Sequence, residues 1–130
     1  MFIDTTILIR ILNTNKDTND FKKIFDHLQN GQHFISALQL AEVSDWCLKN
    51  ELDPNESISC IKKMANIMLP NEAIYLSGSK IKKELRDKGI RKAGINDGII
   101  LATARHLGQK LLTTDNDFRS EYDVIVLEFK

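Results

Sequence analysis

Acidic side chains stand beside several apolar stretches of this chain, in a pattern that could hold a divalent cation. Asp4 directly follows the apolar start, and Asp115 and Asp117 directly follow the stretch LLTT. Glu42 lies within ISALQLAEV, and Asp97 lies within INDGIILATARHLG. Carboxylates that converge on one place repel one another unless a cation lies between them. Ligand sets made only of oxygen suit Mg²⁺ or Mn²⁺.

Taken one at a time, most of these acids also have a structural interpretation. Asp4 and Asp97 could cap helices, and Asp115 with Asp117 could form a turn. Glu42 fits such an interpretation poorly, because it lies on a helix dense in apolar residues where no structural role calls for a carboxylate. The hypothesis of a site therefore depends on whether the fold brings the acids together.

The hydrophobic pattern predicts short strands that alternate with helices. Strong helix starts are expected at DPNE, where Asp53 is the cap and Pro54 is in the first turn, and at Ser36 with Gln39, which has the form of a capping box. Strands are expected at 1–4, 32–36, 73–77, 109–114 and 122–129, and helices at 5–13, 17–31, 37–50, 53–68, 80–89 and 96–108.

This alternation predicts one α/β domain over residues 1–130, with three α/β/α layers and a mainly parallel central sheet. In a parallel sheet, strand ends of the same polarity share one edge. We therefore expect Asp4 and Asp115 to be neighbours at that edge, and Asp97 to point toward it from the start of its helix.

The composition is that of an ordinary globular protein, with 130 residues of which 42% are hydrophobic and 28% are charged. No window is long and apolar enough for a membrane span. Asp4 and Arg10 interrupt the apolar stretch near the start, so no signal peptide is expected. Cys47 and Cys60 are expected to be reduced core residues of a cytoplasmic protein.

The net charge is zero, but the charges are unevenly distributed. The basic segment Lys80–Lys92 carries seven basic residues against Glu84 and Asp87, which leaves +5 there and −5 on the rest of the chain. Such a run is most often a solvated helix face. It is also a candidate surface for RNA phosphates, through Lys82, Lys83, Arg86, Arg91 and Lys92.

Four stretches in order, FIDTTILIRIL, ISALQLAEV, INDGIILATARHLG and LLTTDNDF, resemble the acidic motifs of PIN domains. Their order, their spacing and the chain length resemble those of the small VapC-like toxin ribonucleases of type II toxin–antitoxin pairs. The resemblance implies a PIN-like fold, a metal-dependent endoribonuclease using Mg²⁺ or Mn²⁺, a homodimer and a cognate antitoxin as partner.

The resemblance also implies roles for individual residues. The catalytic residues are Asp4, Glu42, Asp97 and Asp115, and the metal ligands are Asp4, Asp97, Asp115 and the auxiliary Asp117. Thr5 and Thr113 are supporting hydroxyls, with Thr113 beside the first aspartate. Thr6 departs from the family pattern, in which Asn or Ser is common at this position.

The residues favour hydrolysis by a metal-activated water, with Glu42 binding a second ion or accepting the proton of the water. A dehalogenase-type phosphatase needs a second Asp where Thr6 stands. A response-regulator receiver needs acids that this chain lacks after its first and third predicted strands. The remaining alternative is a non-catalytic PIN-like module that binds RNA or protein. His27, His33 and His106 do not offer a metal-free mechanism.

Overall fold

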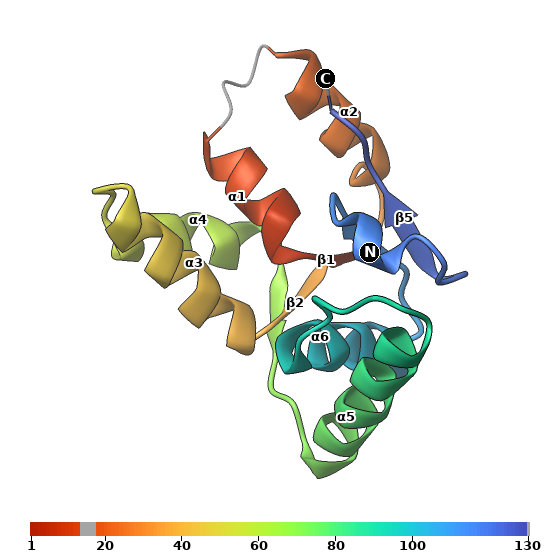
Figure 1. Cartoon of the computed structure of the whole chain (residues 1–130). Coiled ribbons are helices and arrows are strands. Elements are labelled where there is room, and N and C mark those ends of the chain that lie inside the picture. Colours follow the sequence, from red (N-terminus) through yellow and green to blue (C-terminus); the bar gives the residue numbers. More distant parts are fainter. Residues whose placement is uncertain (14–17, 130) are drawn as a thin grey trace.

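The computed structural model describes residues 1–13 and 18–129 as a layered α/β structure around one parallel sheet (Figure 1). The five strands have the order β3-β2-β1-β4-β5, and every neighbouring pair is parallel. The predicted fold class and the parallel sheet are therefore confirmed. The strands are β1 (Phe2–Ile3), β2 (Phe34–Ser36), β3 (Asn66–Met68), β4 (Leu111–Thr113) and β5 (Val124–Val126).

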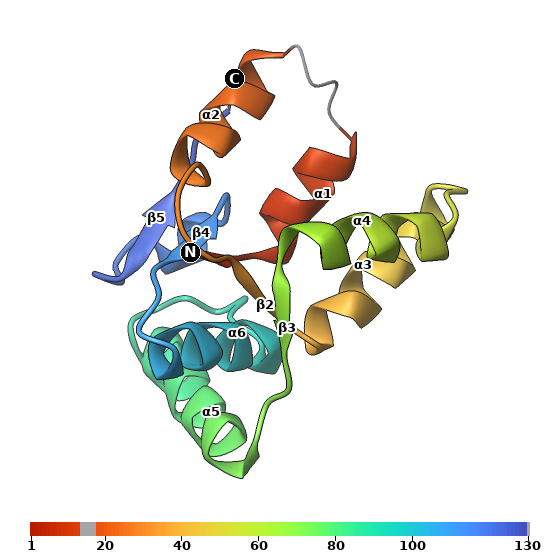
Figure 2. The same ribbon diagram turned by 180° about the vertical axis from the view of Figure 1, so that it is seen from behind.

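Helices cover both faces of the sheet (Figures 1 and 2). The helices α5 and α6 pack on one face, and α1 to α4 contribute to a second core on the other face. Their bounds are α1 (Thr5–Asn13), α2 (Asn19–His27), α3 (Leu38–Lys49), α4 (Pro54–Met64), α5 (Glu72–Asp87) and α6 (Ile95–His106). A 3₁₀ turn, η1 (Asn116–Phe118), follows β4.

The period of two along each strand separates the two cores. In β1, Phe2 packs with α5 and α6, whereas Ile3 packs with the helices of the opposite face. In β4, Leu111 and Leu112 divide in the same way, and all four side chains are fully buried. Both faces of the central strands are covered, as is usual for parallel sheets.

Two glycines set how closely α5 approaches α6. A methyl group added at Gly98 would overlap the carbonyl oxygen of Gly78, and one added at Gly78 would lie 2.9 Å from atoms of Ile99. The backbones of the two helices therefore touch at this crossing. Because Gly98 follows Asp97, the crossing fixes the start of α6 against α5.

The third strand was predicted in the wrong place. Residues 73–77, AIYLS, form part of α5, whereas β3 is Asn66–Met68. The helix predicted at 53–68 was therefore too long, because α4 ends at Met64 and the last residues of that prediction form β3. The side chain of Asn71 caps α5 by accepting a hydrogen bond from the backbone N–H of Ile74 at 3.0 Å. Ile74, Gly78 and Ile81 then fall on one buried helix face, which a short apolar run does not distinguish from a strand.

Predictions for individual residues had mixed outcomes. Asp53 caps α4 as expected, by accepting from Asn55 N at 2.9 Å. Cys47 is buried, but Cys60 is exposed on α4, so the prediction of a core role for Cys60 was wrong. The start of the second predicted helix, at Asp17, lies outside the described residues. In the described part of the chain, no helix is long and apolar enough to cross a membrane.

Candidate active site

The acids gather where the order of the strands reverses. From β1 the chain moves to β2 and β3 on one side of the sheet, and β4 lies on the other side of β1. Carboxyl ends of neighbouring strands leave a crevice at such a point. Asp4 follows β1, and Asp115 follows β4 after one further residue. The backbone N–H of Asp4 donates to the carbonyl of Leu112 at 2.9 Å, so the two strand ends are in register here.

Two threonine hydroxyls hold the carboxylate of Asp4. Thr6 Oγ1 donates to Asp4 Oδ2 at 2.8 Å, and Thr113 Oγ1 donates to the same oxygen at 2.6 Å. Asp4 is 4% exposed. Burial raises the pKa of Asp4 above its ordinary value; hydrogen bonds from Thr113, Thr6 and the Thr5 backbone oppose this rise, and the charge of Asp115 adds to it.

The turn after β4 is built on the same hydroxyls. Thr6 Oγ1 accepts from the backbone N–H of Thr114 at 3.0 Å, and Thr113 Oγ1 accepts from that of Asp115 at 3.0 Å. Asp115 Oδ1 then accepts from Asp117 N at 2.9 Å, which begins η1. The structural interpretation of Asp115 as a turn residue is therefore correct, and the same turn keeps its half-buried carboxylate at the sheet edge.

Glu42 reaches the edge from α3. Its Oε1 accepts a hydrogen bond from Thr5 Oγ1 at 2.8 Å, which ties α3 to the residue after Asp4. Burial is the main cause that raises the pKa of Glu42; the charges of Asp4 and Asp97 raise it further, and hydrogen bonds from Thr5 and Asn96 oppose the rise. A carboxylate on this apolar helix is thus explained by its neighbours at the sheet edge.

Asp97 lies at the third position of α6, and Gly94 is the cap residue. Asp97 Oδ2 accepts from the backbone N–H of Gly94 at 3.1 Å, so the acid does help to close the helix start. Burial raises the pKa of Asp97, as do the charges of Asp4, Asp115 and Asp117, while the Gly94 hydrogen bond lowers it. Asp97 therefore lies close enough to Asp4, Asp115 and Asp117 for their charges to act on it.

We name Asp4, Glu42, Asp97, Asp115 and Asp117 the acid edge. Within the described part of the chain, no basic side chain lies at ion-pair distance from any of these five carboxylates. Among residues 1–13 and 18–129, no three His, Cys, Asp or Glu side chains lie close enough together to hold a metal ion as they stand. The donor set, all oxygen and uncompensated in charge, fits a divalent cation, and its binding requires side chains to turn toward it.

The PIN domain family matches residues 1–122. The chain belongs to the PIN domain family. This match covers all five residues of the acid edge. None of the curated proteins matches the chain in sequence.

Solved structures share the fold of this PIN domain over nearly its whole length. A chain of the toxin–antitoxin complex from Klebsiella pneumoniae is 23% identical, with a TM-score of 0.74, and 96% of this chain and 95% of that chain are covered. For VapBC2 from Rickettsia felis, bound to a DNA fragment from their promoter, the identity is 19%, the TM-score 0.72 and the coverages 97% and 96%. For VapBC-1 from nontypeable Haemophilus influenzae, the corresponding values are 25%, 0.71, 98% and 96%.

The basic residues of this PIN domain are not equivalent. Lys83 pairs with Asp87 at 2.9 Å within α5. Arg86 Nε donates to the carbonyl of Ala93 at 2.9 Å and so holds the loop that leads to α6. Lys82, Arg91 and Lys92 make no ion pair or hydrogen bond within the described residues, which leaves their charges available to a ligand.

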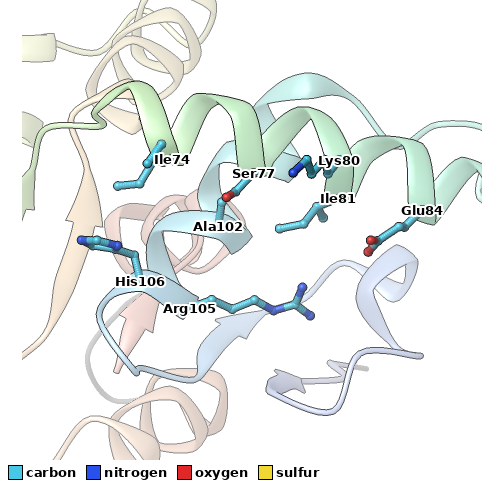
Figure 3. A pocket seen from close by; sticks show the side chains of 9 residues that line it. Ile74, Ser77, Lys80, Ile81, Glu84, Ala102, Arg105 and His106 are labelled. Carbon is cyan, nitrogen blue, oxygen red and sulfur yellow. The ribbon is translucent and has the colours of Figure 1, made fainter.

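The histidines of the PIN domain lie away from the acid edge. His33 Nε2 bonds the carbonyl of Leu28 at 2.8 Å, and His27 ends α2. His106 ends α6 and lines a cavity of about 430 Å³ between α5 and α6, together with Ile74 and Lys80 (Figure 3). None of the five residues of the acid edge lines that cavity. The structure therefore offers no paired histidines at the site.

Three polar residues around the acids were missed by sequence reasoning. Thr6 was treated only as a departure from a pattern, yet it bonds both Asp4 and the β4 turn. Asn96 hydrogen-bonds Glu42. Gln39 was treated as a capping residue, but its side chain also reaches β1. Their closeness in sequence to Asp4, Asp97 and Glu42 was the signal that could have found them.

Proposed function

We propose that this PIN domain is a metal-dependent endoribonuclease that hydrolyses RNA phosphodiester bonds. One observation carries the proposal: the five acids of the acid edge lie around the strand-order reversal, and within the described part of the chain no cationic side chain is at ion-pair distance from them. Carboxylates arranged in this way repel one another, and a bound cation relieves the repulsion. The family membership supports a nuclease over the other aspartate-based enzymes considered above.

Asp4, Asp97 and Asp115 would hold a Mg²⁺ or Mn²⁺ ion, with Asp117 as an auxiliary ligand. Such an ion supplies a bound water of lowered pKa and offsets the charge of the scissile phosphate. Thr6 and Thr113 keep the Asp4 carboxylate in one orientation through their hydrogen bonds to Oδ2. Thr5 does the same for Glu42 through Oε1.

Glu42 is the group best suited to accept the proton of an attacking water. Its half-buried position raises the pKa of its carboxyl, which makes it a stronger base than an exposed glutamate. It also belongs to a different element, α3, from Asp115, which follows β4. Holding a second ion is the other role compatible with this position.

RNA affinity must come from basic residues, since the acid edge repels phosphates. The end of α5 and the loop that follows it carry Lys82, Arg91 and Lys92, and this loop leads directly to Gly94 and Asp97. Lys83 and Arg86 contribute less to the proposed surface, because each already has a partner in the fold.

The proposed biological role is that of a VapC-like toxin, a cytoplasmic homodimer that a cognate antitoxin silences at the acid edge. The support is that the similar structures are toxin–antitoxin and VapBC complexes. The apolar side chains of α1 and α3 do not supply this dimer surface, because they belong largely to the core: Ile7 and Leu8 are fully buried, and Trp46 packs against the same core cluster. A monomeric mass in light scattering at high micromolar concentration would contradict the homodimer.

The test is RNA cleavage by the purified protein with Mg²⁺ or Mn²⁺, in parallel with excess EDTA and with phosphatase substrates. We expect metal-dependent RNA cleavage that Asp97→Asn abolishes. An asparagine side chain still accepts the hydrogen bond of Gly94 N, so the helix start is preserved. Robust cleavage in EDTA would contradict the metal mechanism, and no cleavage under any condition would favour a non-catalytic PIN module.

Asp53→Asn is the matched control, because Asp53 also receives a backbone N–H at a helix start but lies outside the acid edge. This variant should cleave RNA at the wild-type rate. Thermal melts with and without Mn²⁺ complete the design, since at a given concentration a ligand that binds the folded state more tightly stabilises it more. Asp97→Asn should gain less from Mn²⁺ than either wild type or Asp53→Asn.

A further inference from the structure

The central strands β1 and β2 part earlier than the other neighbouring strands. Their register ends at Phe2↔Phe34, whereas β1 and β4 stay paired to Ile3↔Leu112, and β2 and β3 to Ser36↔Met68. Phe34 N donates to the carbonyl of Met1 at 3.0 Å. In a regular parallel ladder, the next bond of this kind would join Ser36 N to the carbonyl of Ile3.

The side chain of Gln39 occupies the place of that bond. Gln39 Oε1 accepts from Ser36 N at 2.7 Å, and Gln39 Nε2 donates to the Ile3 carbonyl at 2.7 Å. The carboxamide therefore acts as an inserted peptide group between two strand ends. The side chain is fully buried, and burying an amide is costly unless both its donor and its acceptor are paired, as they are here.

The two strand ends that Gln39 separates carry the acid edge. Ile3 is the residue before Asp4, and Gln39 precedes Glu42 by three positions on α3, so both side chains lie on the same side of that helix. A second hydrogen bond, from Thr5 to Glu42, links α3 to the same end of β1 as the bond from Gln39 to Ile3 does. The spread between β1 and β2 therefore also sets how far α3 and Glu42 lie from Asp4.

We infer that Gln39 is a positioning residue, which fixes the spacing between Asp4 and Glu42 by holding apart the carboxyl ends of β1 and β2. The inference rests on the proposed function for its catalytic consequence, but not for its geometry. Without the carboxamide, Ser36 N and the Ile3 carbonyl satisfy each other by closing the ladder one step further. That closure moves α3, and Glu42 with it, relative to Asp4.

The test compares Gln39→Met, similar in length but unable to make either hydrogen bond, with Thr103→Val. Thr103 is the matched control, because it is also a fully buried polar residue, but its hydroxyl bonds only Ile99 within α6. For Gln39→Met we expect the Mn²⁺ concentration for half-maximal thermal stabilisation to rise about 10- to 100-fold. At saturating Mn²⁺, kcat should fall while KM for RNA stays near the wild-type value. Thr103→Val should change only the melting temperature.

Crystal structures separate this inference from the proposed function. In Gln39→Met, we expect the β1–β2 register to extend to Ile3↔Ile35 and Glu42 to move relative to Asp4. An unchanged register with both acids in place would overturn the inference, as would a Mn²⁺ response and a kcat equal to those of Thr103→Val. Wild-type protein that neither binds Mn²⁺ nor cleaves RNA would overturn the proposed function alone, since the crystal comparison still decides the role of Gln39.

Should Gln39→Met fail to fold, the wild-type crystal structure with bound Mn²⁺ decides the question. The inference expects both hydrogen bonds of Gln39 to persist in that structure. A direct bond from Ser36 N to the Ile3 carbonyl, with the carboxamide displaced, would overturn it.

Discussion

This protein contains two groups of buried or half-buried carboxylates that the fold treats in opposite ways. At the acid edge, Asp4 and Glu42 receive hydrogen bonds only from hydroxyls and amides. Near the ends of α5 and α6, Glu121 and Asp123 are matched by cations. Arg105 bonds Asp123 through two nitrogens, at 2.8 and 3.1 Å, and Lys88 lies 3.1 Å from Glu121.

This difference distinguishes carboxylates that stabilise the fold from carboxylates of a candidate functional site. Lys88, Arg105, Glu121 and Asp123 form an ion-pair network that ties the end of α5, the end of α6 and the segment before β5 together. Glu121 is 8% exposed, and its carboxylate is paired with Lys88 and Arg105. The acid edge has no such partners within the described residues, so its repulsion is a free-energy cost that the fold alone does not offset. A cost of this kind is typical of a binding or catalytic site.

The largest expected effect is the loss of cleavage in Asp4→Asn. If Asp4 holds the proposed cation, its removal forfeits several kcal/mol of charge stabilisation in the transition state, or on the order of 10²- to 10³-fold in rate. The amide still accepts the hydroxyls of Thr6 and Thr113, so the fold should persist. Cleavage rates with Mn²⁺ provide the measurement, and circular dichroism controls for folding. A variant that retains more than a tenth of the wild-type rate would put Asp4 in the structural class with Glu121.

Removing a cation from the ion-pair network tests the other side of the comparison. Among the described residues, Arg105→Met leaves Asp123 without a cation, while Glu121 keeps Lys88. Removing one partner of a largely buried pair costs about 3 kcal/mol of unfolding free energy. Cleavage should be unchanged at temperatures where the variant is folded. Urea denaturation gives the stability. Lys49→Met, which breaks the exposed pair with Asp45, is the control and should cost less than about 1 kcal/mol. Equal effects in the two variants would remove the distinction.

The pH dependence of stability should distinguish the acid edge by sign. The folded state raises the pKa of Asp4, Glu42 and Asp97 above their ordinary values. As pH falls from neutral toward those ordinary values, the folded state binds protons before the unfolded state does, so these groups add stability as pH falls and lose it as pH rises. In EDTA, Asp97→Asn should therefore melt higher than wild type at pH 7.

The gain in Asp97→Asn at pH 7 should be on the order of 1 kcal/mol after allowance for the partial exposure of the carboxylate. It should shrink as pH falls, because the wild-type carboxyl then becomes neutral as well. Thermal melts of both proteins across pH, in EDTA, measure the difference. A gain that grows toward acid would mean that the surroundings of Asp97 favour its charged form.

The smallest expected effect concerns the basic segment. Lys92→Ala should weaken RNA binding several-fold and reduce the slope of log K against log salt by about 1, because one phosphate contact is lost. Lys83→Ala should change the slope much less, since Lys83 is paired with Asp87. Binding titrations at several salt concentrations, with catalysis blocked by EDTA, provide the measurement. Equal slopes in the two variants would contradict the assignment of the RNA surface to unpaired cations.

Much of the fold was predictable from local patterns. Strands at 34–36, 111–113 and 124–126 lie within the predicted ranges, and α6 was placed within a residue of its start. Asp53 as cap and Pro54 in the first turn predicted the start of α4. The segment AIYLS was one exception, because five apolar or small residues fit either the helical or the strand period. The cap at Asn71 and the contact of Gly78 with α6 decided in favour of a helix. Residues 66–68 were another exception, predicted as the end of a helix but forming β3.

In the candidate site too, local patterns predicted some residues, and only tertiary contacts revealed others. The acids could be selected from the sequence because carboxylates beside apolar segments at strand ends have a recognisable spacing. The role of Thr6 could not be selected in this way, since its importance comes from Thr113 and Thr114, more than a hundred positions away along the chain.

The sequence by itself determined the alternation of strands and helices, the five acids and the unbalanced charge of the basic segment, because these depend on residue type and short-range spacing. Tertiary structure alone decided which strands are neighbours, where their register ends, and which acids meet without a cation. Those outcomes depend on contacts such as Gln39 with Ile3 and Arg105 with Asp123. A contact between distant segments leaves no periodic trace along the chain, so only the folded structure reveals it.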